Sequence, residues 1–242
     1  STLCSWHVGR DCITSTFGRQ AIAMVWDHPE ANPFSGSSGN FDSGVGQVMK
    51  FLNISLTNKS HSDMANAETQ EISRDKIVST DPPYYDNICY ADLSDFFYFW
   101  LKKILSNSYQ HLFTTIATPK DQELIASPYR FKKKSDAEDF FLSGMTNAMH
   151  RLSMLSNKAY PVTIYYAFKQ SEIGNVVSAA GWETFLQAMI NSGFSIVGTW
   201  PMNTEYTSHL KKEANALASS IVMVCRYRLT DSDTINRKEF VS

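Results

Sequence analysis

The chain has 242 residues, of which 43% are hydrophobic and 13% aromatic, and its formal net charge is −2. This length and composition predict a globular protein with a sizeable core, built as one large α/β domain or two small ones. The nearly neutral charge excludes a generally basic nucleic-acid binder, so any contact with DNA must come from local patches. No apolar run approaches the roughly 18 residues of a membrane span, and no signal-peptide pattern is present. We therefore expect a cytoplasmic protein that does not enter a membrane.

The four cysteines lie far apart in the sequence and form no Cys-x-x-Cys pair; they are Cys4, Cys12, Cys89 and Cys225. His7 lies between the first two, but three residues at this spacing lack the fourth ligand of a zinc site. We expect reduced thiols, no disulfide and no metal.

Residues 1–75 are expected to form an N-terminal segment. An apolar run at residues 21–26 is typical of a strand or a buried helix. Small residues at 32–39 predict a loop, which is either a cofactor loop whose backbone closely approaches the ligand, or a substrate-side or structural loop. Apolar residues at helical spacing predict a helix over residues 44–56; they are Val45, Val48, Met49 and Leu52.

The most informative stretch begins at Ile77 with a β-branched run that predicts a buried strand. Pro82 and Pro83 end this strand, because neither can donate a hydrogen bond to a neighbouring strand. The result is a stiff loop at the carboxyl end of a strand, which is where open α/β sheets bind ligands.

The side chains of this loop point to recognition of a planar amino group. Asp81 is a carboxylate that only accepts hydrogen bonds at neutral pH. Together with a carbonyl of the proline segment, it can accept both hydrogens of an exocyclic amino group. Tyr84 offers a ring on which a base can stack, which is worth about 1–3 kcal/mol per base. The alternative is a proline-terminated turn with buried tyrosines.

The remainder of the chain predicts further helices and strands. An aromatic helix over residues 90–105 has Asp92 or Ser94 as its cap, and a second helix covers 135–157 with a capping start at Ser135. Strands and one more helix follow, with Gly193 ending that helix; they cover residues 161–168, 181–191, 194–201 and 219–226.

Asp-Pro-Pro-Tyr at Asp81–Tyr84 resembles the motif of amino-methylating DNA methyltransferases. The similarity extends over most of residues 17–228, and the chain more specifically resembles the C-terminal catalytic part of large adenine-specific DNA methylases that carry an N-terminal domain of unknown function. The motif belongs to a matching stretch over Asp81–Leu101, and the other matching stretches are Phe17–Ala21, Asn32–Ser35, Phe168–Glu172, Gly181–Phe185, Gly198–Pro201 and Asn215–Ser220.

The resemblance implies a Rossmann-like fold that binds S-adenosylmethionine, present in part and with an antiparallel final strand pair. Residues 76–230 would be the catalytic half of the methyltransferase domain, and residues 231–242 a frayed tail. In that family the glycine-rich cofactor loop lies upstream, so we expect this chain, which starts at Ser1 without a methionine, to be part of a longer protein. This argues against a cofactor role for the loop at 32–39.

The resemblance also implies roles for individual residues. Asp81, Pro82, Pro83 and Tyr84 would form the catalytic loop, which methylates the amino group of a flipped adenine directly. The cofactor would contact Asn66, Ala67, Asp81 and Phe96, for which the alternatives are a solvated linker at Asn66 and core packing of the aromatic helix. DNA would contact Tyr85, Arg130, Lys132 and Lys133, although the basic run can equally be a solvated face.

Two other functions remain open from the sequence. Related motifs act on planar amides, so the substrate can be RNA or the glutamine amide of a protein. The chain can also be an inactive nucleic-acid-binding fragment that lacks the cofactor half.

Overall fold

The computed structural model describes residues 3–7, 12–15, 32, 34–36, 40–52, 60–86, 88–168, 171–173, 176–178, 180–202 and 219–228. The chain divides into two compact units, Ser1–Met64 and Ala65–Ser242. The apolar run at 21–26, the stretch at 17–21, residues 215–218 of the stretch Asn215–Ser220 and the tail at 231–242 lie outside the described residues. Together the described elements form a mixed α/β protein.

The first unit contains a hairpin and a helix. Strands β1 (Leu3–His7) and β2 (Cys12–Ser15) pair antiparallel. Helix α1 (Phe41–Leu52) begins earlier than predicted, because the Asn40 side-chain oxygen accepts a hydrogen bond of 2.7 Å from the Ser43 amide and caps it. All residues of α1 are exposed in the described part of this unit, including its predicted apolar side.

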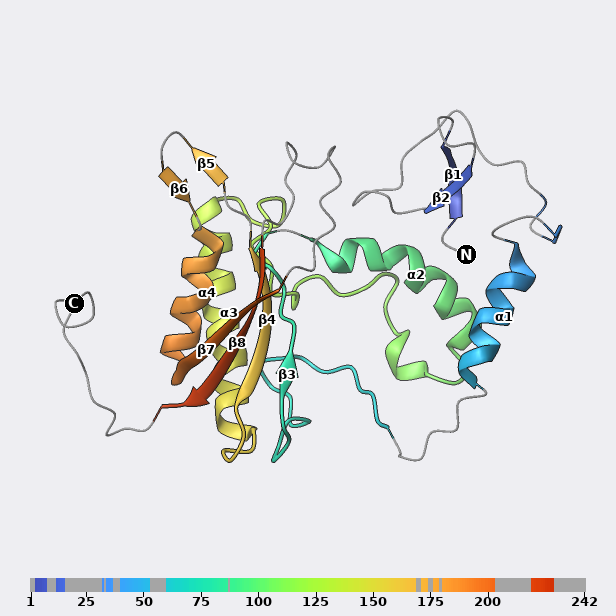
Figure 1. Ribbon diagram of the computed structural model, residues 1–242. Coiled ribbons are helices and arrows are strands. Elements are labelled where there is room, and N and C mark those ends of the chain that lie inside the picture. The colour runs from blue at the N-terminus through green and yellow to red at the C-terminus, as the bar shows by residue number, and fades with distance from the viewer. Residues whose placement is uncertain are drawn as a thin grey trace. The chain divides into compact units, whose positions relative to one another are not determined.

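The second unit is built on a four-stranded sheet with the order β3-β4-β8-β7 (Figure 1). Strand β3 (Ser79–Thr80) is parallel to β4 (Val162–Phe168), whereas β8 (Ser219–Tyr227) is antiparallel to both β4 and β7 (Phe194–Met202). The predicted antiparallel pairing of the last two strands is confirmed. A short hairpin of β5 (Ser171–Ile173) and β6 (Val176–Ser178) follows β4.

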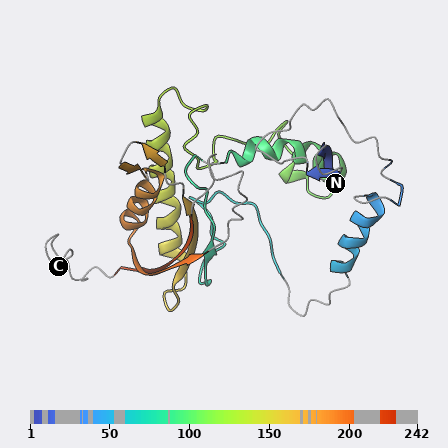
Figure 2. The same ribbon diagram turned by 45° about the horizontal axis from the view of Figure 1, so that its top comes forward.

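Two helices cover one face of this sheet. They are α3 (Lys134–Leu155) and α4 (Ala180–Asn191), which lie side by side in both views (Figures 1 and 2). Helix α4 ends at Asn191, and Gly193 terminates it as predicted, with a φ of 87° that a glycine adopts without strain. The predicted capping start of α3 at Ser135 is wrong, since the helix begins at Lys134 without a side-chain cap.

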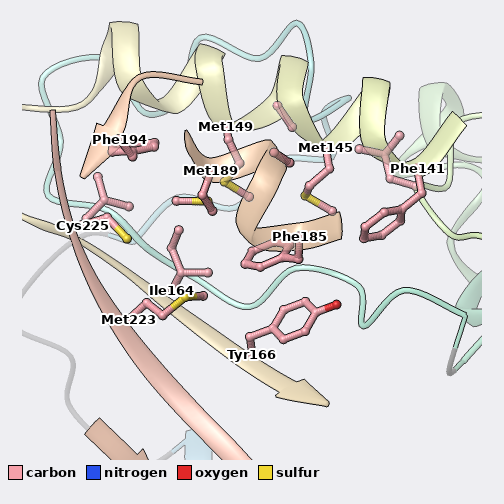
Figure 3. Close-up of a cluster of buried hydrophobic side chains, with 14 of the residues drawn as sticks. Phe141, Met145, Met149, Ile164, Tyr166, Phe185, Met189, Phe194, Met223 and Cys225 are labelled. Atoms are coloured by element: carbon pink, nitrogen blue, oxygen red, sulfur yellow. The ribbon is translucent and has the colours of Figure 1, made fainter. Parts of the chain in front are cut away.

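The core lies between these helices and the sheet (Figure 3). Phe141 of α3 and Phe185 of α4 are fully buried, and Ile164 of β4 and Met223 of β8 meet them from the sheet. Burying one such side chain stabilises the fold by about 1.5–3 kcal/mol. This core fixes β4, and β4 in turn positions β3 through a hydrogen bond of 3.1 Å from the Thr163 amide to the Val78 carbonyl.

The predicted buried strand at Ile77 is shorter and more exposed than expected. Only Ser79 and Thr80 form β3, and the Ile77 side chain is 66% exposed. The reason is that β3 pairs only with β4 among the described residues, so it is an edge strand.

Helix α2 (Tyr90–Leu105) departs from its predicted packing. The residues whose spacing predicts an inward face are all exposed; they are Phe96, Phe97, Trp100, Leu101 and Ile104. Tyr98 is the buried residue of the helix instead, and its hydroxyl donates to the Thr115 carbonyl at 2.9 Å. The predicted cap at Asp92 or Ser94 is wrong, because the helix begins without a side-chain cap. A short 3-10 helix, η2 (Gln110–Leu112), follows.

Among the described residues, none of the helices has the length and apolar character needed to cross a bilayer. In the same part of the chain, no three His, Cys, Asp or Glu side chains gather closely enough to hold a metal ion.

Candidate active site

The turn after β3 brings the predicted catalytic residues to one place. Asp81 is exposed, Pro82 is buried, and Pro83 and Tyr84 are half-buried. The Tyr84 hydroxyl donates a hydrogen bond to the Asp81 Oδ1 atom. The segment therefore presents an acidic group to solvent from a turn whose proline is anchored in the protein.

Tyr166, at the carboxyl end of β4, supports this turn from the neighbouring strand. The Tyr84 and Tyr166 rings meet edge to face, with centroids 5.5 Å apart. Tyr166 itself stacks on Phe185 at 4.2 Å, and burial together with the nearby Asp86 carboxylate raises the pKa of its phenol. The buried Tyr166 hydroxyl therefore stays protonated over the physiological range and acts as a fixed support.

The next residue, Tyr85, turns towards the interior. Its ring meets Phe141 edge to face at 5.2 Å, and its hydroxyl donates to the Glu138 Oε1 atom at 3.0 Å. Burial, followed by the Glu138 hydrogen bond and charge, raises the pKa of the Tyr85 phenol. Since this ring packs against the core, its position suits support of the turn better than the contact with DNA that the sequence suggests.

Asn66 and Ala67 lie in a tight turn of their own. The Asn66 side-chain oxygen accepts from the Glu68 amide at 2.8 Å, and its carbonyl accepts from the Gln70 amide at 3.0 Å. The Asn66 amide nitrogen lies 3.5 Å from the Gln122 Oε1 atom. The polar groups of Asn66 thus already make local bonds, whereas Ala67 is exposed.

An open cavity of about 630 Å³ lies between this region and α3. It is lined by Glu68, Thr69, Arg74, Asn147, His150, Arg151, Met154 and Leu155. Both arginines bind the Glu71 carboxylate, and Glu68 lines the cavity, so the two positive charges face two negative ones. Neither Asn66 nor Ala67 lines it.

The predicted basic contacts differ in their surroundings. Arg130 pairs with Asp92 at 2.8 Å and with Glu123 at 2.6 Å, and it donates to the Lys120 carbonyl at 3.0 Å. These bonds tie the 120–130 segment to the start of α2, which gives Arg130 a structural role. Lys132 and Lys133 are exposed and can reach a phosphate backbone.

Phe96 lies on α2 with 38% of its surface exposed, and its ring meets Phe97 edge to face at 5.3 Å. An exposed ring on the helix that follows the Asp81–Tyr84 turn can contact an aromatic ligand. The structure thus gathers Asp81 to Tyr84 in one turn, and it places Phe96, the 66–67 turn and the basic run on separate elements.

Sequence reasoning missed three residues that hold the turn: Tyr166, Glu138 and Gly181. Tyr166 had a usable signal, because the carboxyl ends of parallel neighbouring strands meet at one sheet edge. Glu138 and Gly181 contact Tyr85 from distant helices, and no local pattern predicts those contacts. Comparison with protein-family models and with curated proteins finds no match for this chain.

Proposed function

We propose that this chain carries the amino-group-binding part of an S-adenosylmethionine-dependent DNA adenine methyltransferase. The observation that carries the proposal is the Asp81–Tyr84 turn, in which an exposed carboxylate bonded to the Tyr84 hydroxyl sits at the carboxyl end of β3. The sheet adds support, because a parallel β3–β4 pair continued by β8 and β7, which are antiparallel to each other, agrees with the expected partial Rossmann-like methyltransferase fold.

The chemistry follows from the acceptors of the turn. The nitrogen lone pair of an exocyclic adenine amine is delocalised into the ring and is a poor nucleophile. When Asp81 and a carbonyl of the proline segment accept the two amino hydrogens, electron density returns to the nitrogen. The Asp81 carboxylate also favours the positive charge that develops on this nitrogen during transfer, and such preorganised electrostatic stabilisation is usually the largest catalytic contribution.

Tyr84 has two roles in this proposal. Its hydroxyl orients Asp81, and its ring, supported by Tyr166, offers a surface for the flipped base. The exposed Lys132 and Lys133 would contact the DNA backbone.

S-adenosylmethionine, when bound, supplies the methyl group. The described residues fit this cofactor only in part: Asp81, Ala67 and Phe96 are exposed, whereas the polar groups of Asn66 already make local bonds. We therefore propose that an upstream part of the same protein completes the cofactor site with a glycine-rich loop.

The proposal is tested by incubating the chain, and the full-length product of its gene, with unmethylated DNA, RNA or glutamine-containing peptides and labelled S-adenosylmethionine. Mass spectrometry of the digested products should detect N6-methyladenine in DNA. Asp81→Asn should lower the rate at least about 100-fold, as expected for loss of one preorganised group, and exposed Asp139→Asn serves as the matched control. Methyl transfer only to RNA or peptide, or full activity of Asp81→Asn, would overturn the proposal.

A further inference from the structure

Tyr85, the residue that follows the candidate catalytic turn, has an unfavourable backbone conformation. Its φ is 54°, and Asp75 is the other non-glycine residue with a positive φ in the described part of the chain. This region is unfavourable for an L-residue, so it persists only where surrounding contacts hold it.

Four contacts hold Tyr85: one comes from the loop before α3, and three come from helices α3 and α4. The Ala126 amide donates to the Tyr85 carbonyl at 2.9 Å, and the Tyr85 hydroxyl donates to Glu138 on α3 at 3.0 Å. The Phe141 ring packs against the Tyr85 ring at 5.2 Å. Gly181 of α4 approaches so closely that a Cβ there would lie 2.8 Å from the Tyr85 Cβ.

The conformation of Tyr85 bears directly on Asp81. Tyr84 and Tyr85 are consecutive, and their side chains serve different purposes: Tyr84 bonds Asp81 and packs on Tyr166, while Tyr85 is anchored on α3. If Tyr85 left its αL conformation, the direction of the chain at Tyr84 would change and the Tyr84–Asp81 bond would be lost. The contacts that hold Tyr85 therefore also keep the Asp81 carboxylate in place through its bond to Tyr84.

We propose that Glu138, acting through the Tyr85 hydroxyl, is a positioning residue that keeps the Asp81–Tyr84 turn in the conformation that accepts an amino group. The structural part of this inference is that the Glu138–Tyr85 hydrogen bond holds the conformation of the turn. The functional part is that methyl transfer needs this conformation, and it rests on the proposed methyltransferase activity. Lys134 lies 3.6 Å from the same Glu138 oxygen on an exposed helix turn and supports the carboxylate only weakly.

The Ala126 amide provides the readout, because it is buried and donates directly to the Tyr85 carbonyl. Native-state hydrogen exchange of the full chain is measured for wild type, Glu138→Ala, Glu138→Gln and Tyr85→Phe. Loss of a hydrogen bond to a charged group should speed Ala126 exchange about tenfold or more in Glu138→Ala and in Tyr85→Phe. In the double variant that combines Glu138→Ala with Tyr85→Phe, Ala126 should exchange no faster than in either single variant, because each substitution removes the same hydrogen bond.

Glu138→Gln retains a side-chain oxygen that accepts from the Tyr85 hydroxyl and should restore slow exchange. Asp139→Ala, at the adjacent exposed acid of α3, is the matched control and should leave Ala126 unchanged. Exchange of the core amide of Met149 should not change in any of these variants. Equal acceleration at Ala126 and Met149, or unchanged Ala126 exchange in Glu138→Ala, would overturn the structural part.

The functional part is read from the methylation rate of the same variants. Glu138→Ala should lower kcat with little change in KM, and Glu138→Gln should recover it. Normal kcat in Glu138→Ala despite rapid Ala126 exchange would overturn the positioning role while leaving the proposed activity intact. If wild type transfers no methyl group to any substrate, the proposed function and the functional part fail together, and the exchange measurement still decides the structural part.

Discussion

Gly181→Ala is the perturbation that tests most simply how tightly the turn is held. A methyl group at this position would lie 2.8 Å from both Cβ and Cγ of Tyr85 and 3.0 Å from its Cδ1 atom. Atoms this close to the backbone cannot swing away as the end of a flexible side chain can. The Tyr85 backbone or the start of α4 must therefore move.

The expected cost follows from this geometry. Forcing one extra methyl into a well-packed contact costs about 1–3 kcal/mol. Replacing glycine by alanine inside a helix gains up to about 1 kcal/mol, but Gly181 is at the start of α4, where the gain is smaller. We expect Gly181→Ala to lower the free energy of unfolding by about 1–2 kcal/mol, the overpacking cost less this small gain.

Urea unfolding followed by circular dichroism and extrapolated linearly to water measures this free energy. Gly198→Ala is the control, because its Cβ would lie 3.9 Å from Val224, an ordinary contact. It should change stability by less than about 0.5 kcal/mol. If Gly181→Ala is as stable as wild type, Tyr85 does not pack closely on α4, and α4 does not hold the turn in place.

Three further predictions concern the second unit. Phe185→Ala, which empties a fully buried site, should cost about 3–5 kcal/mol in urea unfolding, and a loss below about 1 kcal/mol would contradict the packing of the core. Burial raises the pKa of the Cys225 thiol to about 12, so iodoacetamide at about pH 8 should leave it unmodified in the native chain while half-buried Cys89 reacts, as peptide mass spectrometry can show. The hydrogen bond with Lys120, followed by that with Thr118, lowers the pKa of Asp95 from its ordinary 3.8, so its stabilising contribution is present above that value and is lost as pH falls below it. Asp95→Asn should therefore flatten the fall in stability below about pH 4; an unchanged slope would contradict the pairing.

The second half of the fold follows closely from local sequence signals. The alternating and β-branched residues of β4, β7 and β8 predict strands at nearly their observed bounds, and Gly193 ends α4 as its φ of 87° requires. The spacing of hydrophobic residues predicts an element correctly when that element packs against a core, and these segments do pack against one.

The same signals fail where no core lies against the element. Helix α2 has an aromatic pattern typical of a buried face, yet Trp100 is 53% exposed and the helix packs through Tyr98. In the candidate site, the sequence predicts Asp81 and Tyr84 from a contiguous motif. The contacts of Tyr85 with Glu138 and Gly181 join residues far apart in the chain, and only the folded structure reveals them.

The proposed role of Asp81 is tested by the ratio of methyl-transfer rates between wild type and Asp81→Asn, measured on unmethylated DNA with the full-length gene product. Asparagine keeps the size of the side chain but removes the charge and replaces one acceptor oxygen by a donor group. The proposed role of Asp81 predicts a rate ratio of about 100 or more with unchanged unfolding free energy. A ratio near one, with N6-methyladenine still formed by Asp81→Asn, would contradict it.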